Sequence, residues 1–353
     1  MKKIGIVTPA NLKYTPYINN YIRILEEQGI DYEILSWDRI GLDENCNFRF
    51  KFKTNDYNRK RVFVGYVIFA AKCKRYIKKN KIDKLIILTY APAFFLGIHF
   101  LKHNKYIIDV RDDSPLIKSF PKIFNEITNN AEEIVVSSPK FAEWMPKKSI
   151  LCHNADLELL EKYYNTRTYF NNKFPISIVY AGTMIENKIN IEIIDLLKND
   201  GRFHFLFIGR NNPKKIEIEE FVKNNEINNV SFEGTYAKED IIDIYRKNAS
   251  LINIFRENTI VNKNALPNKL YEAVIAGIPL AVFDHNEAIS RYAKDYNLGV
   301  VLPEENKIIG EQIIEYMNIF NESEYENGRI EFLNKVKKDM ETFKEQLLHF
   351  VMS

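Results

Sequence analysis

Short runs of β-branched and aromatic residues alternate with longer helical patterns along the whole chain. A strand, a helix and a second strand in succession form a right-handed crossover between parallel strands. The alternation therefore predicts an α/β protein with parallel sheets. The expected strands are residues 4–8, 32–36, 85–89, 106–110, 133–136, 149–152, 175–183, 203–208, 230–232, 250–254, 280–283 and 300–301. The expected helices lie near residues 17–28, 62–79, 93–103, 121–130, 139–145, 189–198, 216–224, 238–247, 267–276 and 287–296.

The alternation stops over the polar residues 155–173 and restarts at residue 175. Because 353 residues exceed what one hydrophobic core usually organises, two domains are expected. We predict two Rossmann-like domains facing a cleft, residues 1–160 and 161–325. C-terminal helices over residues 326–353, in a helical tail that begins near residue 306, are expected to pack back toward the N-terminal domain. Ligands of such sheets bind outside the carboxyl ends of the strands.

Composition excludes several classes of protein. The hydrophobic fraction of 46% and the charged fraction of 27% are ordinary for a globular protein. The sequence contains no run of 18 apolar residues, and the N-terminus lacks a signal-peptide pattern, so a cytoplasmic location is expected. Cys46, Cys73 and Cys152 are far apart and lack CxxC spacing, which argues against a disulfide framework and a zinc site.

Positive charge is concentrated in the first half of the chain. Residues 1–155 carry 26 Lys and Arg against 16 Asp and Glu. Much of this surplus lies between Arg49 and Lys81, where Asp56 is the only acidic residue and aromatic residues are interleaved. Such a stretch suits peripheral contact with an anionic membrane or a phosphate-bearing substrate. The alternative is the solvated face of an ordinary helix, and no nucleic-acid-binding motif accompanies the charge.

The strongest local signal is the segment 265–279, which contains Pro267, Lys269, Glu272 and Gly277. Pro267 suits the first turn of a helix and Gly277 suits its C-terminal cap. A carboxylate only accepts hydrogen bonds, so Glu272 matches the two vicinal hydroxyls of a ribose, while the helix start suits a phosphate. The alternative interpretation is a surface salt bridge between Lys269 and Glu272, three residues apart.

This segment resembles the donor-binding signature P-x-K-x-x-E of glycosyltransferase family 4. Residues 179–183, 207–210 and 230–236 resemble the family in the same order, whereas the first half is similar only at residues 109–112 and 154–156. The resemblance implies a retaining glycosyltransferase with the GT-B fold, active in bacterial cell-surface polysaccharide or glycoconjugate synthesis. Its donor, a nucleotide-sugar with UDP-sugar favoured, would bind the C-terminal domain, and a glycan or lipid-linked acceptor the N-terminal one.

The resemblance also implies roles for single residues. Glu272 would hold the ribose hydroxyls. The loop of residues 234–236, after the expected strand 230–232, would flank the base. Arg210 and Lys188 would stabilise the leaving diphosphate, with Lys214 and Lys269 behind them. Asn264 stands eight residues before Glu272, where the family often has a first glutamate, so the sugar meets an amide there instead of a charge. The remaining implied donor contacts are Gly182, Thr183, Gly234, Thr235 and Tyr236.

Retention in this family often proceeds without a protein nucleophile, so the resemblance implies neither a metal nor another cofactor. Asp109, Arg111, Asp112 and Asp113 would bind acceptor, and Asp112 or Asp113 would orient its hydroxyl. The alternative is a strand-end turn in which the Asp side chains cap the backbone at Ser114.

Other functions fit the sequence less well. The patterns GxSxG, HExxH, GxGxxG and a Walker loop are absent, which argues against hydrolase, zincin, NAD and NTPase functions. His153 is expected to be structural. A catalytically silent subunit that positions an active partner stays open because of Asn264. An epimerase of nucleotide-sugars also stays open, although its clusters of catalytic carboxylates and histidines are not evident.

Overall fold

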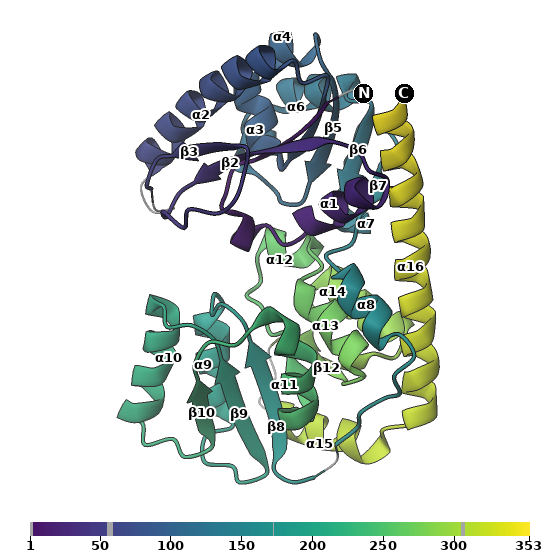
Figure 1. The fold of residues 1–353 in the computed structure, drawn as a ribbon. Helices are drawn as coiled ribbons and strands as arrows, with labels where there is room; N and C mark the ends of the chain where they lie inside the picture. Colours follow the sequence, from purple (N-terminus) through teal and green to yellow (C-terminus); the bar gives the residue numbers. More distant parts are fainter. Residues whose placement is uncertain (1–2, 55–58, 172, 305–307) are drawn as a thin grey trace. The chain divides into compact units, whose positions relative to one another are not determined.

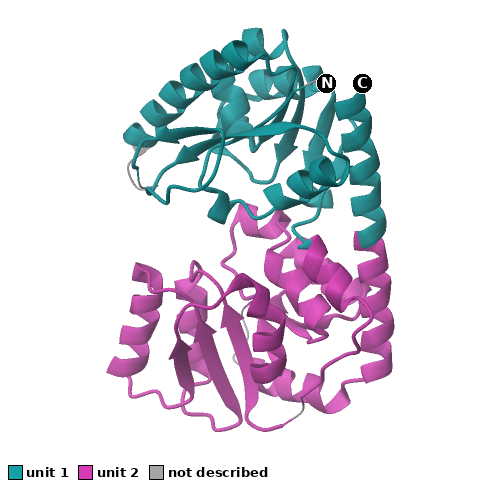
Figure 2. Cartoon of the chain, in the orientation of Figure 1, with its two compact units in different colours: residues 1–156, 337–353 teal, residues 157–336 magenta. Residues whose placement is uncertain are grey.

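The computed structural model describes residues 3–54, 59–171, 173–304 and 308–353. The chain divides into two compact units, residues 1–156 with 337–353 and residues 157–336 (Figure 2). Each unit is built on one parallel sheet, with strand orders β3-β2-β1-β4-β5-β6-β7 and β10-β9-β8-β11-β12-β13. The predicted α/β fold with two Rossmann-like sheets is confirmed.

The elements of the first unit run in chain order through its seven strands (Figure 1). The strands are β1 (Ile4–Thr8), β2 (Tyr32–Asp38), β3 (Phe48–Lys51), β4 (Lys84–Leu88), β5 (Lys105–Val110), β6 (Glu133–Val136) and β7 (Ile150–Leu151). The helices are η1 (Leu12–Tyr14), α1 (Ile18–Glu27), α2 (Arg59–Asn80), α3 (Tyr90–Leu96), α4 (Ile98–Leu101), α5 (Pro115–Ser119), α6 (Pro121–Asn130) and α7 (Pro139–Ala142).

The second unit repeats the alternation around six strands. The strands are β8 (Ile176–Ala181), β9 (Phe203–Ile208), β10 (Val230–Glu233), β11 (Leu251–Asn253), β12 (Leu280–Phe283) and β13 (Gly299–Leu302). The helices are α8 (Leu157–Tyr163), α9 (Asn187–Leu196), α10 (Pro213–Asn224), η2 (Lys238–Asp240), α11 (Ile241–Asn248), α12 (Ile260–Asn264), α13 (Asn268–Ala276), α14 (Glu287–Asp295) and α15 (Ile309–Ile319). The last helix, α16 (Glu322–Met352), begins in this unit, and its final residues belong to the first.

Three local expectations were wrong. Strand β3 lies in the basic stretch, where charge hid the alternation of Phe48 and Phe50. The helix expected over residues 93–103 is two helices, because Gly97 has a φ of 77° and a ψ of 149°, a conformation that interrupts a helix. The polar residues 155–173 contain α8, whose buried side chains include Leu160 and Tyr163. Residues 305–307, where the helical tail was expected to begin, and residues 55–58, which include Asp56, lie outside the described residues.

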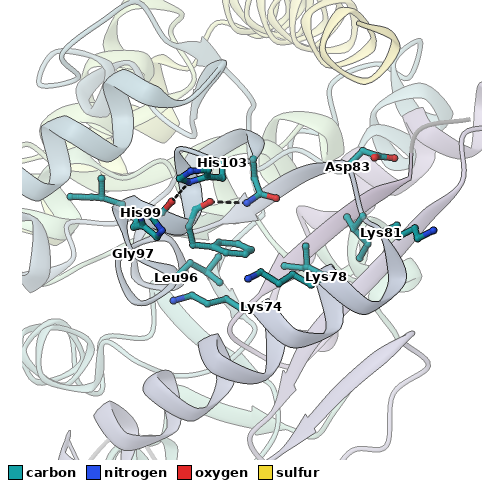
Figure 3. Close-up of a pocket in the computed structure, with 13 residues that line it drawn as sticks. Lys74, Lys78, Lys81, Asp83, Leu96, Gly97, His99 and His103 are labelled. Carbon is teal, nitrogen blue, oxygen red and sulfur yellow. Dashed lines mark hydrogen bonds between the residues drawn. The ribbon is translucent and has the colours of Figure 1, made fainter.

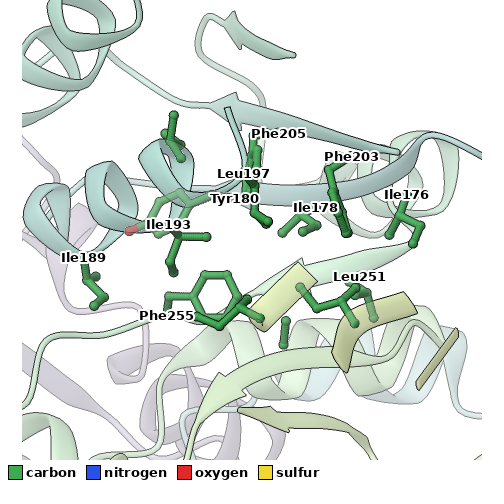
Figure 4. Close-up of a cluster of buried hydrophobic side chains, with 14 of the residues drawn as sticks. Ile176, Ile178, Tyr180, Ile189, Ile193, Leu197, Phe203, Phe205, Leu251 and Phe255 are labelled. Carbon is green, nitrogen blue, oxygen red and sulfur yellow. The ribbon is translucent and has the colours of Figure 1, made fainter. Parts of the chain in front are cut away.

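The core of the second unit lies between its sheet and the helices beside it (Figure 4). Ile178 on β8 and Phe205 on β9 are neighbours in the sheet and are about 1% exposed, as is Ile193 on α9. Burial of apolar area at roughly 25 cal/mol per Å² makes this the main stabilising contribution to the unit. The core therefore fixes the carboxyl ends of β8 and β9, where the sequence placed the donor site.

The end of α16 is part of the core of the first unit. The ring of Phe343 packs edge-on against Tyr21 of α1, with centroids 4.9 Å apart. The buried Lys84, at the start of β4, donates to the carbonyl oxygens of Phe350 and Val351. Because the last four carbonyls of a helix lack partners within it, this lysine caps α16. In the described ranges, no helix combines the length and hydropathy needed to cross a bilayer.

Candidate functional site

Two glycines bring the loops after β8 and β9 into contact at the carboxyl edge of the six-stranded sheet. Gly182 has a φ of 129°, which side-chain-bearing residues rarely adopt. A Cβ on Gly209 would lie 2.1 Å from the carbonyl oxygen of Gly182. The Tyr180 hydroxyl, at the end of β8, donates to the carbonyl of Thr183 at 2.9 Å and holds the first loop in place. The exposed Thr183 therefore stands on a fixed turn at this edge.

Helix α13 carries the motif that the sequence singled out. Pro267 is its N-terminal cap, with extended backbone, and Gly277 ends the helix in the left-handed conformation. Leu270 and Tyr271 are buried on the face toward the core, so the opposite side of the first turn presents Lys269 and Glu272. The capping residues predicted from sequence thus determine where these two side chains stand.

Lys269 lies on the ring of Tyr180. Its ammonium is 3.8 Å from the ring centroid, a cation–π contact. A Cβ on Gly182 would lie 3.5 Å from the same nitrogen. It would also lie 4.0 Å from the hydroxyl oxygen of Tyr236. The motif on α13, the turn after β8 and the loop after β10 therefore meet at one place, with a cation at its centre.

Glu272 stands one turn further along α13, next to two tyrosines. The Tyr245 hydroxyl, from α11, donates to its carboxylate at 3.4 Å. Burial first, and the negative charge of Glu272 second, raise the pKa values of Tyr236 and Tyr245. Because Glu272 is only partly buried, its carboxylate retains capacity to accept further hydrogen bonds.

A partly buried arginine that the sequence did not indicate, Arg256, follows β11. The Nε of Arg256 lies 3.6 Å from the carboxylate of Glu186, which is itself buried. Burial lowers the pKa of Arg256, while the charges of Glu186 and Tyr180 oppose that shift. Among the described residues, the Nη1 of Arg256 has no hydrogen-bond partner. A guanidinium with a spare donor suits a carboxylate or phosphate ligand, but in the sequence Arg256 looks like an ordinary loop residue.

The other predicted cations lie on the loops after β8 and β9. Lys188 is exposed in the first turn of α9, and Arg210 is exposed two residues beyond the end of β9. Lys214 donates to the carbonyl of Ile185 at 2.5 Å, which joins the two loops. Its neighbour Lys215 is buried and donates to the carbonyls of Gly209 and Glu233, a structural role that sequence alone did not reveal.

The remaining predicted donor residues are placed by two short segments. Gly234 and Thr235 are exposed in the loop after β10, beside Tyr236. Asn264 is the last residue of α12 and is partly buried. In the part of the chain that the structure describes, no group of three or more His, Cys, Asp or Glu side chains could hold a metal ion.

In the first unit, the candidate acceptor residues follow β5. Asp109 is fully buried and accepts from the Tyr21 hydroxyl and from Arg111 Nε, both at 2.8 Å. Arg111 also donates to Asn154 at 2.7 Å and lies 3.9 Å from the ring centroid of Tyr17. Burial raises the pKa of Asp109, and the charge of Arg111 opposes that shift. This pair is therefore a structural element at the carboxyl end of β5.

The next residues are closer to solvent. Asp112 is exposed, and Asp113 pairs with Lys118 at 2.6 Å. The cap of α5 is Ser114 itself, whose hydroxyl accepts from the Leu116 amide at 3.4 Å. Asp112 is thus accessible from solvent at the carboxyl end of β5.

His153 precedes the segment that leads into the second unit. It is fully buried, and its Nε2 lies 3.0 Å from the carboxylate of Asp339 on α16. This contact agrees with the structural role expected from the sequence.

Comparison with known proteins extends this description. Residues 175–319 match the family model for glycosyl transferases group 1. A glycosyltransferase from Rickettsia africae ESF-5 shares the fold at 15% identity, with a TM-score of 0.66 over 99% of this chain and 98% of that one. Sucrose-phosphate synthase from Thermosynechococcus elongatus shares the fold at 12% identity, with a TM-score of 0.67 over 99% of this chain and 100% of that one.

A trehalose-6-phosphate structure from E. coli bound with UDP-2-fluoro glucose is similar at 10% identity, with a TM-score of 0.65 over 98% of this chain and 99% of that one. No curated protein is significantly similar in sequence. The segment that matches this family model, residues 175–319, contains all the candidate donor contacts. The chain has the GT-B fold, and the protein is a glycosyltransferase.

The buried pair after β5 gives a stability prediction. Replacing Asp109 by Asn leaves the Arg111 guanidinium buried without its counter-charge, so unfolding free energy should fall by roughly 3–5 kcal/mol. The control is Asp43→Asn, since Asp43 is 62% exposed and pairs with surface cations, and little change is expected there. Urea denaturation measures both variants. Equal losses for the two would show that the buried pair is not structural.

Proposed function

We propose that this protein transfers a sugar from a nucleotide-sugar, with a UDP-sugar favoured, to a glycan or lipid-linked acceptor with retention of configuration. The reaction would serve bacterial cell-surface polysaccharide or glycoconjugate synthesis. The observation that carries the proposal is the meeting of Lys269, Glu272 and Tyr236 beside the fixed turn at Gly182. All four lie in the segment that matches the family model.

The chemistry of these groups suits a nucleoside diphosphate. The Glu272 carboxylate accepts from the two ribose hydroxyls, and Tyr236 flanks the base. Lys269, at the positive end of α13, and Arg256, with its spare Nη1 donor, face the negative phosphates. The E. coli relative in complex with UDP-2-fluoro glucose supports a UDP-sugar as the donor to test first.

The transfer step needs charge stabilisation more than a protein nucleophile. In the proposed step the bond from the anomeric carbon to the diphosphate oxygen breaks, and a bond to the acceptor oxygen forms on the same face. The proton of the acceptor hydroxyl passes to the leaving phosphate. Lys188 and Arg210 stabilise the negative charge on that phosphate, and Asp112 orients the acceptor hydroxyl. Asn264 contacts the transferred sugar through its amide.

The donor site is tested by binding. We expect one of a panel of UDP-, GDP- and dTDP-sugars to bind in isothermal titration, and Glu272→Ala to weaken that donor about 10- to 100-fold. Each hydrogen bond to a charged group contributes about 1.5–3 kcal/mol. Glu220→Ala, an exposed glutamate on α10, is the matched control and should bind like the wild type.

Other results of the same titration favour other functions. No binding of any donor would overturn the transferase proposal and favour the silent subunit. Interconversion of two UDP-sugars without transfer would point to the epimerase. A product with inverted anomeric configuration, identified by NMR, would contradict the retention of configuration but not the sugar transfer.

The leaving-group cations are tested by kinetics. Lys188→Ala and Arg210→Ala should each lower kcat for donor hydrolysis, on the order of 10²-fold, because the charge they stabilise develops as the bond breaks. Lys223→Ala, exposed at the far end of α10, is the control. The assays contain EDTA, since no metal takes part in the proposed step. Loss of wild-type activity with EDTA would contradict that point, and unchanged kcat in both variants would remove the two cations from the mechanism.

We also propose that the basic stretch makes peripheral contact with the inner face of the cell membrane. Most of its aromatic residues are not available, because Phe50 and Phe69 are buried around Trp37. Helix α2 nevertheless exposes Phe63 at 56%, together with Val64 and Val67. Exposed lysines and arginines, including Lys72, Arg75 and Lys79, follow on the same helix.

Vesicle flotation tests this contact. Vesicles that contain anionic lipid should recruit the protein at low ionic strength, and Phe63→Ser should weaken recruitment because it removes an apolar anchor. Ile319→Ser, at a residue that is 71% exposed on α15, is the control and should not change recruitment. Absence of wild-type recruitment at low salt would end the proposal.

A further inference from the structure

The first unit contains a pocket of about 750 Å³ that belongs to neither the donor nor the acceptor residues (Figure 3). Lys74, Lys78 and Lys81 line it from the second half of α2 and the turn that follows. His99 and His103 line it from α4 and the turn after it. In Figure 3 the side chain of Lys81 points away from the other four, so Lys74, Lys78, His99 and His103 border the same part of the pocket.

The position of this pocket separates it from the acceptor residues. Lys81 precedes β4 and His103 precedes β5, so both lie at the amino edge of the seven-stranded sheet. The candidate acceptor residue Asp112 follows β5 and lies at the carboxyl edge. In a parallel sheet the two edges are separated by the length of a strand, so a ligand in this pocket does not occupy the acceptor position.

The charges around the pocket are not balanced within the protein. Among the described residues, no carboxylate pairs with Lys74, Lys78 or Lys81 within 4.0 Å. The carboxylate that lines the pocket, Asp83, accepts from the backbone amide of Lys3 at 2.9 Å. Burial first, and the nearby charge of Lys78 second, lower the pKa of the half-buried Lys74. A bound anion would reduce this electrostatic cost.

The His103 ring is held in place by the backbone of its own turn. Its Nδ1 lies 2.7 Å from the carbonyl oxygen of His99, and the two histidine ring centroids are 4.8 Å apart. Asn104 donates to the carbonyl of Phe100 at 2.7 Å and fixes the same turn. The Nε2 of His103 is thus directed away from this backbone contact.

The pocket also has apolar walls. Ile98 and Phe100 are partly buried and line it above the buried Ile77 and Leu96, and the Phe100 ring lies 5.7 Å from the Lys74 ammonium. A small inorganic anion would satisfy the lysines but leave these walls in water. A ligand with a phosphate and a carbon skeleton matches both parts of the pocket.

We propose that this pocket binds the phosphate group of an organic phosphate ester, as a second ligand site beyond the transferase site. The phosphate oxygens accept from Lys74 and Lys78, and the carbon skeleton packs on Ile98 and Phe100. The ester is either a soluble metabolite or the headgroup of an anionic lipid.

The experiment titrates the full chain with glycerol 1-phosphate and, separately, floats it with phosphatidylcholine vesicles that carry phosphatidic acid. Lys74→Gln and Lys78→Gln each remove one cation from the pocket. Lys122→Gln is the matched control, because Lys122 is exposed on α6 of the same unit, outside the basic stretch, and does not line the pocket. Thermal unfolding confirms that each variant is folded.

We expect both pocket variants to weaken binding about tenfold, or about 1.4 kcal/mol, because each removes one charged hydrogen bond, and the control to weaken it less than twofold. Binding of glycerol 1-phosphate with this order of variants supports a soluble ester. The same order with vesicles alone supports a lipid headgroup. Equal weakening by all three variants would mean non-specific attraction and would overturn the proposal, as would the absence of binding to either probe. Donor titration of the same variants reports the transferase site independently.

Discussion

The close approach of the loops after β8 and β9 is the constraint on which the donor site depends. A Cβ on Gly209 would lie 2.1 Å from the carbonyl oxygen of Gly182, so any side chain at residue 209 would force that carbonyl to move. Moving that turn would also move the ring of Tyr180, on which the Lys269 ammonium lies at 3.8 Å. Backbone packing at two glycines therefore fixes the position of the Lys269 ammonium, which comes from a helix that begins about 60 residues after Gly209.

Around this constraint the second unit keeps a buried polar atom that the described part of the protein does not pair. The Nη1 of Arg256 is buried without a hydrogen-bond partner among the described residues. Such groups are costly to bury unless a ligand completes their hydrogen bonds. At the corresponding edge of the first unit Asp109 pairs with Arg111, and among the described residues the Oδ1 of Asp109 is buried without a hydrogen-bond partner. The surplus of charge in this unit lies instead at the amino edge of the sheet, around Lys74 and Lys78.

Much of the fold follows from patterns that are local in sequence. Buried parallel strands read as continuous apolar runs, so 12 of the 13 strands, including β1, β5 and β9, were predicted close to where they lie. Strand β3 was missed because half its residues are charged, and α8 was missed because its few apolar residues sit among polar ones. The motif on α13 was recognised because its proline, lysine, glutamate and glycine stand at fixed spacings that a helix imposes.

The sequence by itself determined the two parallel sheets, the caps of α13 and the set of polar residues at strand ends. It did so because these features depend on residues within one or two turns of each other. Only the tertiary structure decided that Lys269 rests on Tyr180, that Arg256 Nη1 has no partner among the described residues, and that Asp109 pairs with Arg111. Those outcomes depend on which side chains from distant segments are buried together, and the electrostatic cost of burial is set by such neighbours.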